Sequence, residues 1–395
     1  MKKEINKFLY FYRFLATVDI LNIPKLRFKE FTDEWVYYKY KDIFNLNQGL
    51  QIPITERFLD YAPNRFFYIT NEFLKPSSKK SYYIENPSPN VICTKEDILM
   101  TRTGNTGKVI TNIAGVFHNN FFRIKYNPKN FNKDFICCIL NQNKIQNKIL
   151  TLAGSSTIPD LNHKDFYSIK SRFPKLKEQE KIAKFINTVD KKKENIENTI
   201  SSLENQKKGL LQQIFSQKLR FKDENGNNYP NWEKKKLGDI LKICHGKDYK
   251  NEPNEKKLYP VLGTGGIITY IDNFLCNWKC VLIGRKGTIN KPQYMETPFW
   301  SVDTLFYSKP KTKQNPKFQY YLFQNINWIK YDESTGVPSL SASTIENISF
   351  VLPCLEEQTK IADFLSAFDR KLENKKAQLE HWQQIKKGLL QQMFV

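Results

Sequence analysis

Two segments of the chain, residues 174–215 and 353–394, carry apolar residues at alternating steps of four and three. This average period of 3.5 residues predicts a long helix with a coiled-coil seam in each segment. Two matching seams in one chain favour pairing of the helices with each other over separate places in an ordinary bundle. The first seam is predicted to hold Ile182, Ile186, Val189, Ile196, Ile200, Leu203, Lys207 and Leu210. The second is predicted to hold Ile361, Leu365, Phe368, Leu372, Leu379, Trp382, Lys386 and Leu389.

The two segments are also copies of each other, because they align without a gap and both contain KKGLLQQ. Upstream, KLRFK at 25–29 returns at 218–222, followed each time by a tryptophan, Trp35 or Trp232. An internal repeat of this kind predicts the plan unit, helix, unit, helix. The predicted boundaries are 1–21 for an N-terminal extension, 22–173 for the first unit, 174–216 for its helix, 217–352 for the second unit and 353–395 for the last helix.

The bodies of the two units read as mixed structure. Short β-rich runs such as VICTKEDILM and CVLIG are broken by Gly, Pro and Asn, while DFICCILNQNKIQNKIL and FQYYLFQNINWI have helical patterns. Strands interleaved with short helices predict an α/β (α+β) body whose topology the pattern does not define. The bodies have diverged much further than the helices, as expected for two different ligands on one shared frame.

Composition narrows the class of ligand. The formal net charge is +22, which favours a polyanion, with nucleic acid preferred to a membrane surface. The abundance of Lys, Asn and Ile weakens this inference, since the same bias is typical of AT-rich genomes. No segment approaches the roughly 20 apolar residues of a membrane span. Seven cysteines at irregular spacing predict free thiols in a reducing cytoplasm.

Signs of catalysis are absent from the sequence motifs. There is no HExxH, GxSxG or adenine-methyltransferase signature, and the GTGG at 263–266 lacks the lysine of a phosphate-binding loop. The spacing of Cys244, His245, Cys276 and Cys280 matches no standard zinc pattern. Nuclease carboxylates assembled from distant segments are the alternative that sequence leaves open. We therefore predict no catalytic residue and no metal site.

Binding signals are clearer and occur as matched loops. MTRTGNTGKV and VLIGRKGTINKP each place an arginine on a Gly-rich turn after an apolar strand, and arginine is the commonest specific reader of guanine. GSSTIP at 154–159 and ESTGVP at 333–338 add hydroxyl groups suited to phosphates or base edges. The alternatives are solvated turn charges and plain turns. The candidate DNA-binding residues are Arg102, Thr103, Asn105, Lys108, Ser155, Ser156, Thr157, Arg285, Lys286, Thr288, Lys291, Ser334 and Thr335.

At this point the sequence resembles a known family. The pattern PxLxEQxxIAxF…D…KxEN…KKGLLQQxF, present at 174–215 and 353–394, is similar to the repeats of the specificity subunit of type I restriction–modification systems. The starts PKLRF at 24–28 and QKLRF at 217–221, each with its Trp and Asp-Ile, fit the same family. The resemblance covers the chain from about residue 22 onward and leaves the role of residues 1–21 open.

The resemblance implies two target-recognition domains, each reading one half of a bipartite sequence in double-stranded DNA. The two helices are expected to pair as an antiparallel coiled coil, which gives a pseudo-twofold internal repeat and sets the half-site separation. Expected partners are two methyltransferase subunits and two motor–nuclease subunits, which carry S-adenosylmethionine, ATP and Mg. The chain itself is expected to be a non-enzymatic, cytoplasmic subunit without a cofactor.

Three alternatives remain at the level of sequence. The chain could direct a fused, type II-like restriction–methylation enzyme, or it could be a coiled-coil DNA-binding scaffold with no enzyme partner. A cryptic nuclease is the third. Co-purification with a methyltransferase subunit distinguishes among them.

Overall fold

The computed structural model describes residues 23–75, 78, 80–154 and 157–394 of the chain. The predicted extension 1–21 and the candidates Ser155 and Ser156 lie outside these residues. The chain divides into two compact units, one formed by residues 1–195 with 379–395 and the other by residues 196–378. Each unit contains a mixed α/β body and parts of both long helices.

The described residues of the first body form three small sheets and four short helices. A two-stranded sheet joins β1 (Val36–Lys39) to β10 (Lys170–Phe173). One four-stranded sheet has the order β2 (Phe44–Gln48), β9 (Phe121–Tyr126), β6 (Ile98–Thr101) and β7 (Val109–Ile110). The other has the order β4 (Tyr82–Glu85), β3 (Arg65–Ile69), β8 (Gly115–Phe117) and β5 (Ile92–Cys93). The helices are α2 (Tyr40–Ile43), α3 (Lys133–Leu140), α4 (Asn143–Ala153) and α5 (His163–Ser168), with 3₁₀ turns η1 (Ile54–Glu56), η2 (Asn71–Leu74) and η3 (Pro89–Val91).

The second unit repeats most of this order of elements, with one α-helix in the place of α3 and α4 and no counterpart of β5 among its described strands. A two-stranded sheet joins β11 (Glu233–Lys236) to β19 (Ser349–Leu352). A four-stranded sheet has the order β12 (Leu241–His245), β18 (Leu305–Pro310), β15 (Cys280–Gly284) and β16 (Gln293–Met295). A three-stranded sheet has the order β14 (Gly266–Ile271), β13 (Tyr259–Gly263) and β17 (Trp300–Ser301). Its helices are α7 (Leu237–Ile240), α8 (Pro316–Asn325), η4 (Trp328–Tyr331) and α9 (Ala342–Glu346). In both units one strand pair is parallel, β3 with β8 and β13 with β17. The two bodies therefore share the strand order of their two-stranded and first four-stranded sheets, whereas the remaining sheet, as described, has four strands in the first body and three in the second.

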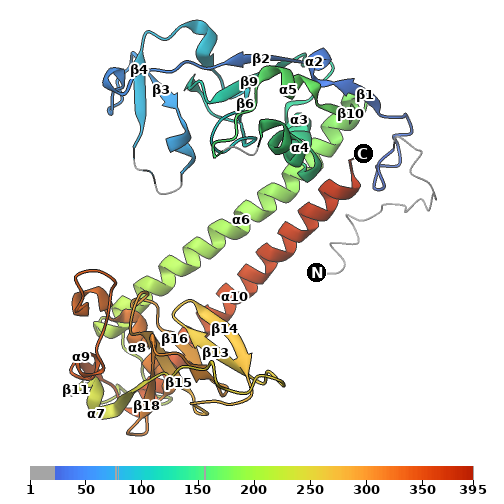
Figure 1. Ribbon diagram of the computed structural model, residues 1–395. Coiled ribbons are helices and arrows are strands. Elements are labelled where there is room, and N and C mark those ends of the chain that lie inside the picture. The colour runs from blue at the N-terminus through green and yellow to red at the C-terminus, as the bar shows by residue number, and fades with distance from the viewer. Residues whose placement is uncertain (1–22, 76–77, 79, 155–156, 395) are drawn as a thin grey trace. The chain divides into compact units, whose positions relative to one another are not determined.

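Two long helices carry the repeated segments. Helix α6 (Leu176–Phe215) has 40 residues and α10 (Leu355–Gln392) has 38, and Figure 1 shows each as one unbroken helix. The first part of α6 belongs to the first unit and its remainder to the second, whereas α10 begins in the second unit and ends in the first. The predicted mixed α/β fold with two long helices is confirmed. No helix among the described residues is long and apolar enough to span a membrane.

A phenylalanine that follows KKGLLQQ seals the core of each unit. In the first unit Phe394 packs against Trp35 and Phe135, with ring centroids 6.1 and 5.3 Å away. In the second unit Phe215 packs against Trp232 at 6.4 Å and against a phenylalanine of α8 at 5.6 Å. Aromatic pairs at these separations add to the energy of burial. The repeated tail therefore ends inside a body in both cases.

A buried carboxylate joins the start of each unit to the start of its long helix. Glu178 accepts two hydrogen bonds of 2.7 Å from the guanidinium of Arg27 and one of 3.3 Å from the indole of Trp35. Glu357 accepts bonds of 2.8 and 2.9 Å from Arg220 and one of 2.9 Å from Trp232. Both carboxylates are almost fully buried, so they depend on these charge-assisted bonds. The repeated KLRF, Trp and Glu-Gln signals are thus one cluster in each unit.

The glutamine after each carboxylate orders the neighbouring backbone. Gln179 Nε2 donates to the Pro174 carbonyl at 2.8 Å, and its Oε1 accepts from the amide of Asn132 at 2.9 Å. Gln358 makes the same pair of bonds, to Pro353 at 2.9 Å and from Asn315 at 3.0 Å. Asn132 and Asn315 are the N-caps of α3 and α8, respectively. One buried amide therefore links the start of the long helix to the start of a body helix.

Each unit also contains an ion pair between its parts of α6 and α10. In the first unit Lys386 Nζ lies 2.7 Å from both carboxylate oxygens of Asp190. In the second unit Lys207 Nζ lies 2.5 Å from Asp369 Oδ1, and Tyr321 donates to Oδ2 at 2.6 Å.

These pairs define the relative direction of the helices within a unit. In the second unit Lys207 of α6 pairs with Asp369 of α10, and Glu204 pairs with Lys376 at 2.8 Å. A residue earlier in α6 thus meets a residue later in α10, so the two helices run antiparallel. The aspartate precedes the lysine in each copy, so a parallel alignment would place aspartate beside aspartate. A polar pair in an apolar seam is an established device for fixing register.

Replacing Arg220 with Ala is expected to lower the free energy of unfolding of the second unit by about 3–5 kcal/mol, because the buried Glu357 loses its charged partner. Urea unfolding followed by tryptophan fluorescence measures the change. The matched control is Lys218→Ala at an exposed position, expected to stay within about 0.5 kcal/mol. Equal effects of the two substitutions would exclude the buried cluster as the cause.

Replacing Lys386 with Asp is expected to cost the first unit about 1–2 kcal/mol, since two carboxylates then face each other in a partly buried seam. Adding Asp190→Lys restores an opposite-charge pair and should recover most of the loss. A double-mutant cycle on unfolding free energies measures the coupling. Additive losses from the two substitutions would contradict the proposed pairing.

Candidate nucleic-acid interface

In the first unit, the loop after β6 holds the first group of candidate residues. Arg102 Nη2 donates to Asp160 Oδ2 at 2.6 Å, and Nε donates to the Leu161 carbonyl at 3.3 Å. The hydroxyl of Thr103 bonds to the other oxygen of the same carboxylate. As a result the Arg102 side chain is only 17% exposed. Asn105 and Lys108 of this loop are exposed.

In the second unit, the loop after β15 holds the corresponding group. Arg285 Nη1 donates to the backbone carbonyl of Asp303 at 3.4 Å. Lys286 and Lys291 are exposed, and Thr288 is half-buried. The loop turns at Gly287, whose φ of +85° is a conformation that favours glycine. The equivalent Gly104 has a φ of +87°.

The two loops are built on the same backbone frame. The backbone amide of Arg102 donates to the carbonyl of Asn120 at 2.7 Å, and the backbone amide of Arg285 donates to the carbonyl of Thr304 at 2.8 Å. The amides of Leu161 and Leu340 then donate to the carbonyls of Arg102 and Arg285, both at 2.9 Å. The segments 154–161 and 333–340 are therefore held beside the arginine loops. In each unit the two loops predicted from sequence lie together.

The hydroxyl-rich loops differ in which of their hydroxyl groups are already hydrogen-bonded within the protein. In the first unit Thr157 is exposed. In the second, Ser334 bonds through its hydroxyl to Asp332 at 2.8 Å, while Thr335 is exposed. Amide donors from Ser339 and Ser334 lower the pKa of Asp332, and the hydroxyls of Thr344 and Ser341 lower the pKa of Glu333. Asp332 is therefore occupied by donors of its own loop, and Glu333 by hydroxyls at the start of α9.

His163 lies behind the first loop. Its ring stacks on Phe122 at 4.7 Å, and the Arg102 guanidinium lies 5.6 Å from the same phenylalanine ring. Burial and the nearby Arg102 charge lower the pKa of His163, so the imidazole is neutral at pH 7. Sequence reasoning missed both this histidine and Asp160, because neither lies within a basic or Gly-rich motif.

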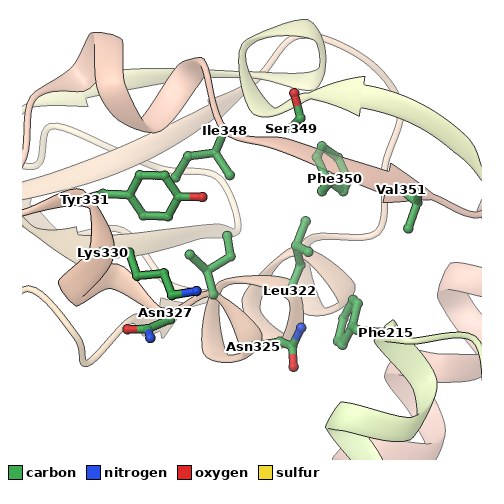
Figure 2. Close-up of a pocket in the computed structure, with 11 residues that line it drawn as sticks. Phe215, Leu322, Asn325, Asn327, Lys330, Tyr331, Ile348, Ser349, Phe350 and Val351 are labelled. Carbon is green, nitrogen blue, oxygen red and sulfur yellow. The ribbon is translucent and has the colours of Figure 1, made fainter.

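A pocket of about 270 Å³ lies in the second unit, and its lining includes none of the candidate loop residues. Figure 2 shows Tyr331 and Lys330 on one side of it and Phe350 on the other, with Phe215 from the end of α6 at its edge. A pocket of about 180 Å³ at the equivalent place in the first unit is lined by Lys144, Lys170, Arg172 and Phe394 among others. In the part of the chain that the structure describes, no three His, Cys, Asp or Glu side chains gather as a metal site.

The predicted seam residues fall into two groups by burial. The buried group is Ile182, Ile186, Val189, Ile196, Ile200, Ile361, Leu365, Leu372 and Leu389. The half-buried group is Leu203, Lys207, Leu210, Phe368, Leu379, Trp382 and Lys386. The most deeply buried are Ile182, Ile186, Ile361 and Leu365, near the starts of the two helices. The two lysines form ion pairs.

Comparison with known proteins places the whole frame in one family. The model of the type I restriction modification DNA specificity domain matches residues 32–205 and again residues 229–381. The chain is 24% identical over 403 residues to the type I restriction enzyme MjaVIII specificity subunit of Methanocaldococcus jannaschii, covering 91% of each chain. A 90-residue stretch is 38% identical to the MjaIX specificity subunit of the same organism, covering 22% of this chain and 21% of that one.

Solved structures show the same fold. The S subunit of a type I restriction-modification system from M. genitalium aligns with a TM-score of 0.64 at 19% identity, covering 94% of this chain and 99% of that one. A chain from a structure of the type I R-M system aligns with a TM-score of 0.54 at 13% identity, covering 90% and 96%. The two matched domains correspond to the two bodies described above.

Proposed function

The chain belongs to the type I restriction–modification specificity subunits, and from this premise we propose that each of its two units reads one half of a bipartite DNA sequence. Specificity subunits are the non-catalytic, DNA-recognising component of these systems, and they act with methyltransferase and restriction subunits. We propose two copies of each partner, with S-adenosylmethionine, ATP and Mg bound by the partners and the complex working in the cytoplasm.

The observation that carries this proposal is the repetition of one loop frame with different side chains. Arg102 and Arg285 stand at equivalent backbone positions, each beside a second loop that carries hydroxyl groups. A shared frame suits a common way of docking on the duplex, since backbone contacts set the register of a protein on DNA. Different side chains on that frame suit different base sequences.

The remaining candidate residues take roles that follow from their exposure. Lys108, Lys286 and Lys291 are exposed cations, and we assign them to phosphates, where lysine acts as a point charge. Asn105, Thr157, Thr288, Ser334 and Thr335 are the polar groups within the same loops. The seam residues are assigned to the helical frame, with Lys207 and Lys386 serving its register through their aspartate partners.

Two alternatives are less favoured. A scaffold without an enzyme partner does not account for a match that extends over 91% of a specificity subunit. A fused, type II-like system would use the same recognition chain with a single combined enzyme. The size and number of the subunits that co-purify with this chain distinguish the two arrangements.

Co-expression of the chain with its methyltransferase subunit is expected to methylate adenine at one bipartite motif with two short defined halves. Genome-wide mapping of N6-methyladenine in a host without other adenine methylation measures it. The control is the methyltransferase subunit expressed alone, which should give no motif. A soluble complex that methylates no motif, or only a single undivided one, would refute the proposed function.

Inserting one heptad into each long helix is expected to lengthen the undefined spacer between the half-sites. The insertions belong after Glu197 and Lys376, which hold equivalent places between the aspartate and the lysine of each copy, so that both ion pairs survive. Seven residues add about 10 Å of helix, roughly three base pairs at 3.4 Å each. The mapped motif reports the spacer, and an unchanged spacer in a folded complex would contradict a helical ruler.

A further inference from the structure

The two loop arginines have the same backbone partners but different neighbours. Thr103 pairs with Asp160, and Lys286 pairs with Ser339, in matching isolated bridges. Asp160 and Ser339 therefore occupy equivalent places. In the first unit the Asp160 carboxylate accepts hydrogen bonds from both Arg102 and Thr103. In the second unit a serine stands there, and no carboxylate is offered at this position.

In the described part of the second unit, the carboxylates of Asp303 and of the neighbouring 333–340 loop form no hydrogen bond or ion pair with the Arg285 guanidinium. Asp303 meets the arginine through its backbone carbonyl. Asp332 accepts from Ser334 and Ser339, and Glu333 accepts from Ser341 and Thr344. Among the described residues of the second unit, the ion pairs involve neither Arg285 nor Lys286. Arg285 and Lys286 therefore have no carboxylate partner among the described residues of the second loop, whereas Arg102 in the first loop is paired with Asp160.

The two turns also differ in how they are covered. A Cβ placed on Gly104 would lie 2.7 Å from Nδ2 of Asn71, which donates to the Thr103 carbonyl at 3.0 Å. A Cβ placed on Gly287 would meet nothing within 4 Å. The side chain of Asn71, in η2, therefore covers the turn of the first arginine loop, whereas no described residue covers the equivalent face of the turn at Gly287.

We propose that the residue at this position, Asp160 or Ser339, determines whether the loop arginine is held by the protein or presented to DNA. Arg285 then contacts a hydrogen-bond acceptor of the duplex, while Arg102 buttresses its loop and leaves reading in the first unit to neutral polar groups. This inference rests on the proposed DNA-reading function and adds an asymmetry between the two half-sites.

The energetics favour this division. For Arg102 to reach DNA, its bond to Asp160 must break, and the released carboxylate then faces phosphates of like charge. Arg285 loses only a weak bond to a carbonyl. Its planar fork matches O6 and N7 of guanine, and it also matches a phosphate, so both acceptors share the required chemistry.

The test compares variants of the full chain in complex with its methyltransferase subunit, using the mapped methylation motif and DNA binding as readouts. Arg285→Ala and Ser339→Asp are expected to relax the same position in one half-site and to weaken binding to the cognate site about 10- to 100-fold. Ser339→Asn, which adds bulk without charge, is the matched control and should keep the motif. The inference is overturned if Arg285→Ala alters the motif or weakens DNA binding while Ser339→Asp changes neither, or if both variants keep the wild-type motif and the wild-type DNA binding.

The first unit supplies the opposite expectation. The double substitution Arg102→Ala with Asp160→Ala removes the pair without leaving an unpaired charge, and we expect the motif to stay unchanged. Relaxation of the other half-site by this double variant, in a complex with a wild-type unfolding midpoint, would overturn the assignment of Arg102. Wild-type methylation of a bipartite motif is the reference in every case, so failure of the proposed function is seen there first.

Arg285→Lys separates the two sources of the acceptor. If Arg285 reads guanine, lysine relaxes one position of the motif, because the bidentate fork is lost. If it binds a phosphate, the motif is kept and binding changes little, whereas Arg285→Ala weakens binding to all sequences and reduces the salt slope by about one. Either result supports presentation to DNA. Wild-type binding, salt dependence and motif in both Arg285 variants would contradict it.

Discussion

The structure depends on two equivalent buried carboxylates, one in each unit, which lie in the first turns of the long helices α6 and α10. Glu178 and Glu357 hold Arg27 and Arg220, which lie at the start of each unit and far away in sequence. A buried ionised group is strongly unfavourable without such partners. The body of each unit is therefore closed by bonds between its first residues and the helix that follows its last strand. The adjacent glutamine extends this closure to the N-cap of α3 or α8.

This closure explains which parts of the repeat have been kept. Three sets of residues are linked in this way: those around the buried carboxylate, those at the N-cap of the body helix and the ion pairs of the seam. A single substitution in any of these sets leaves a charge or a hydrogen-bond donor without its partner. The loops after β6 and β15 share only a few backbone bonds and one equivalent glycine with positive φ, and their side-chain contacts differ. Recognition can thus vary on the loops while the frame stays fixed.

The sequence predicted the long helices, the duplication and the mixed class of the bodies, because each rests on a periodic or repeated signal. It also predicted the two pairs of loops, although their contact with DNA stays a prediction. Strand order could not be predicted, since strands such as β7 and β17 have two residues each and carry no period. The bond between Arg102 and Asp160 was also out of reach, because it joins segments 58 residues apart whose proximity comes from the fold.

The path of the long helices has a consequence for the order in which the protein is made. The first unit includes residues 379–395, so it lacks Lys386, Met393 and Phe394 until the whole second unit has been synthesised. A ribosome therefore releases every residue of the second unit before the first unit is complete. Until then Trp35 and Phe135 pack on each other but lack the ring of Phe394, so the core of the N-terminal body is completed only after the second unit has been made.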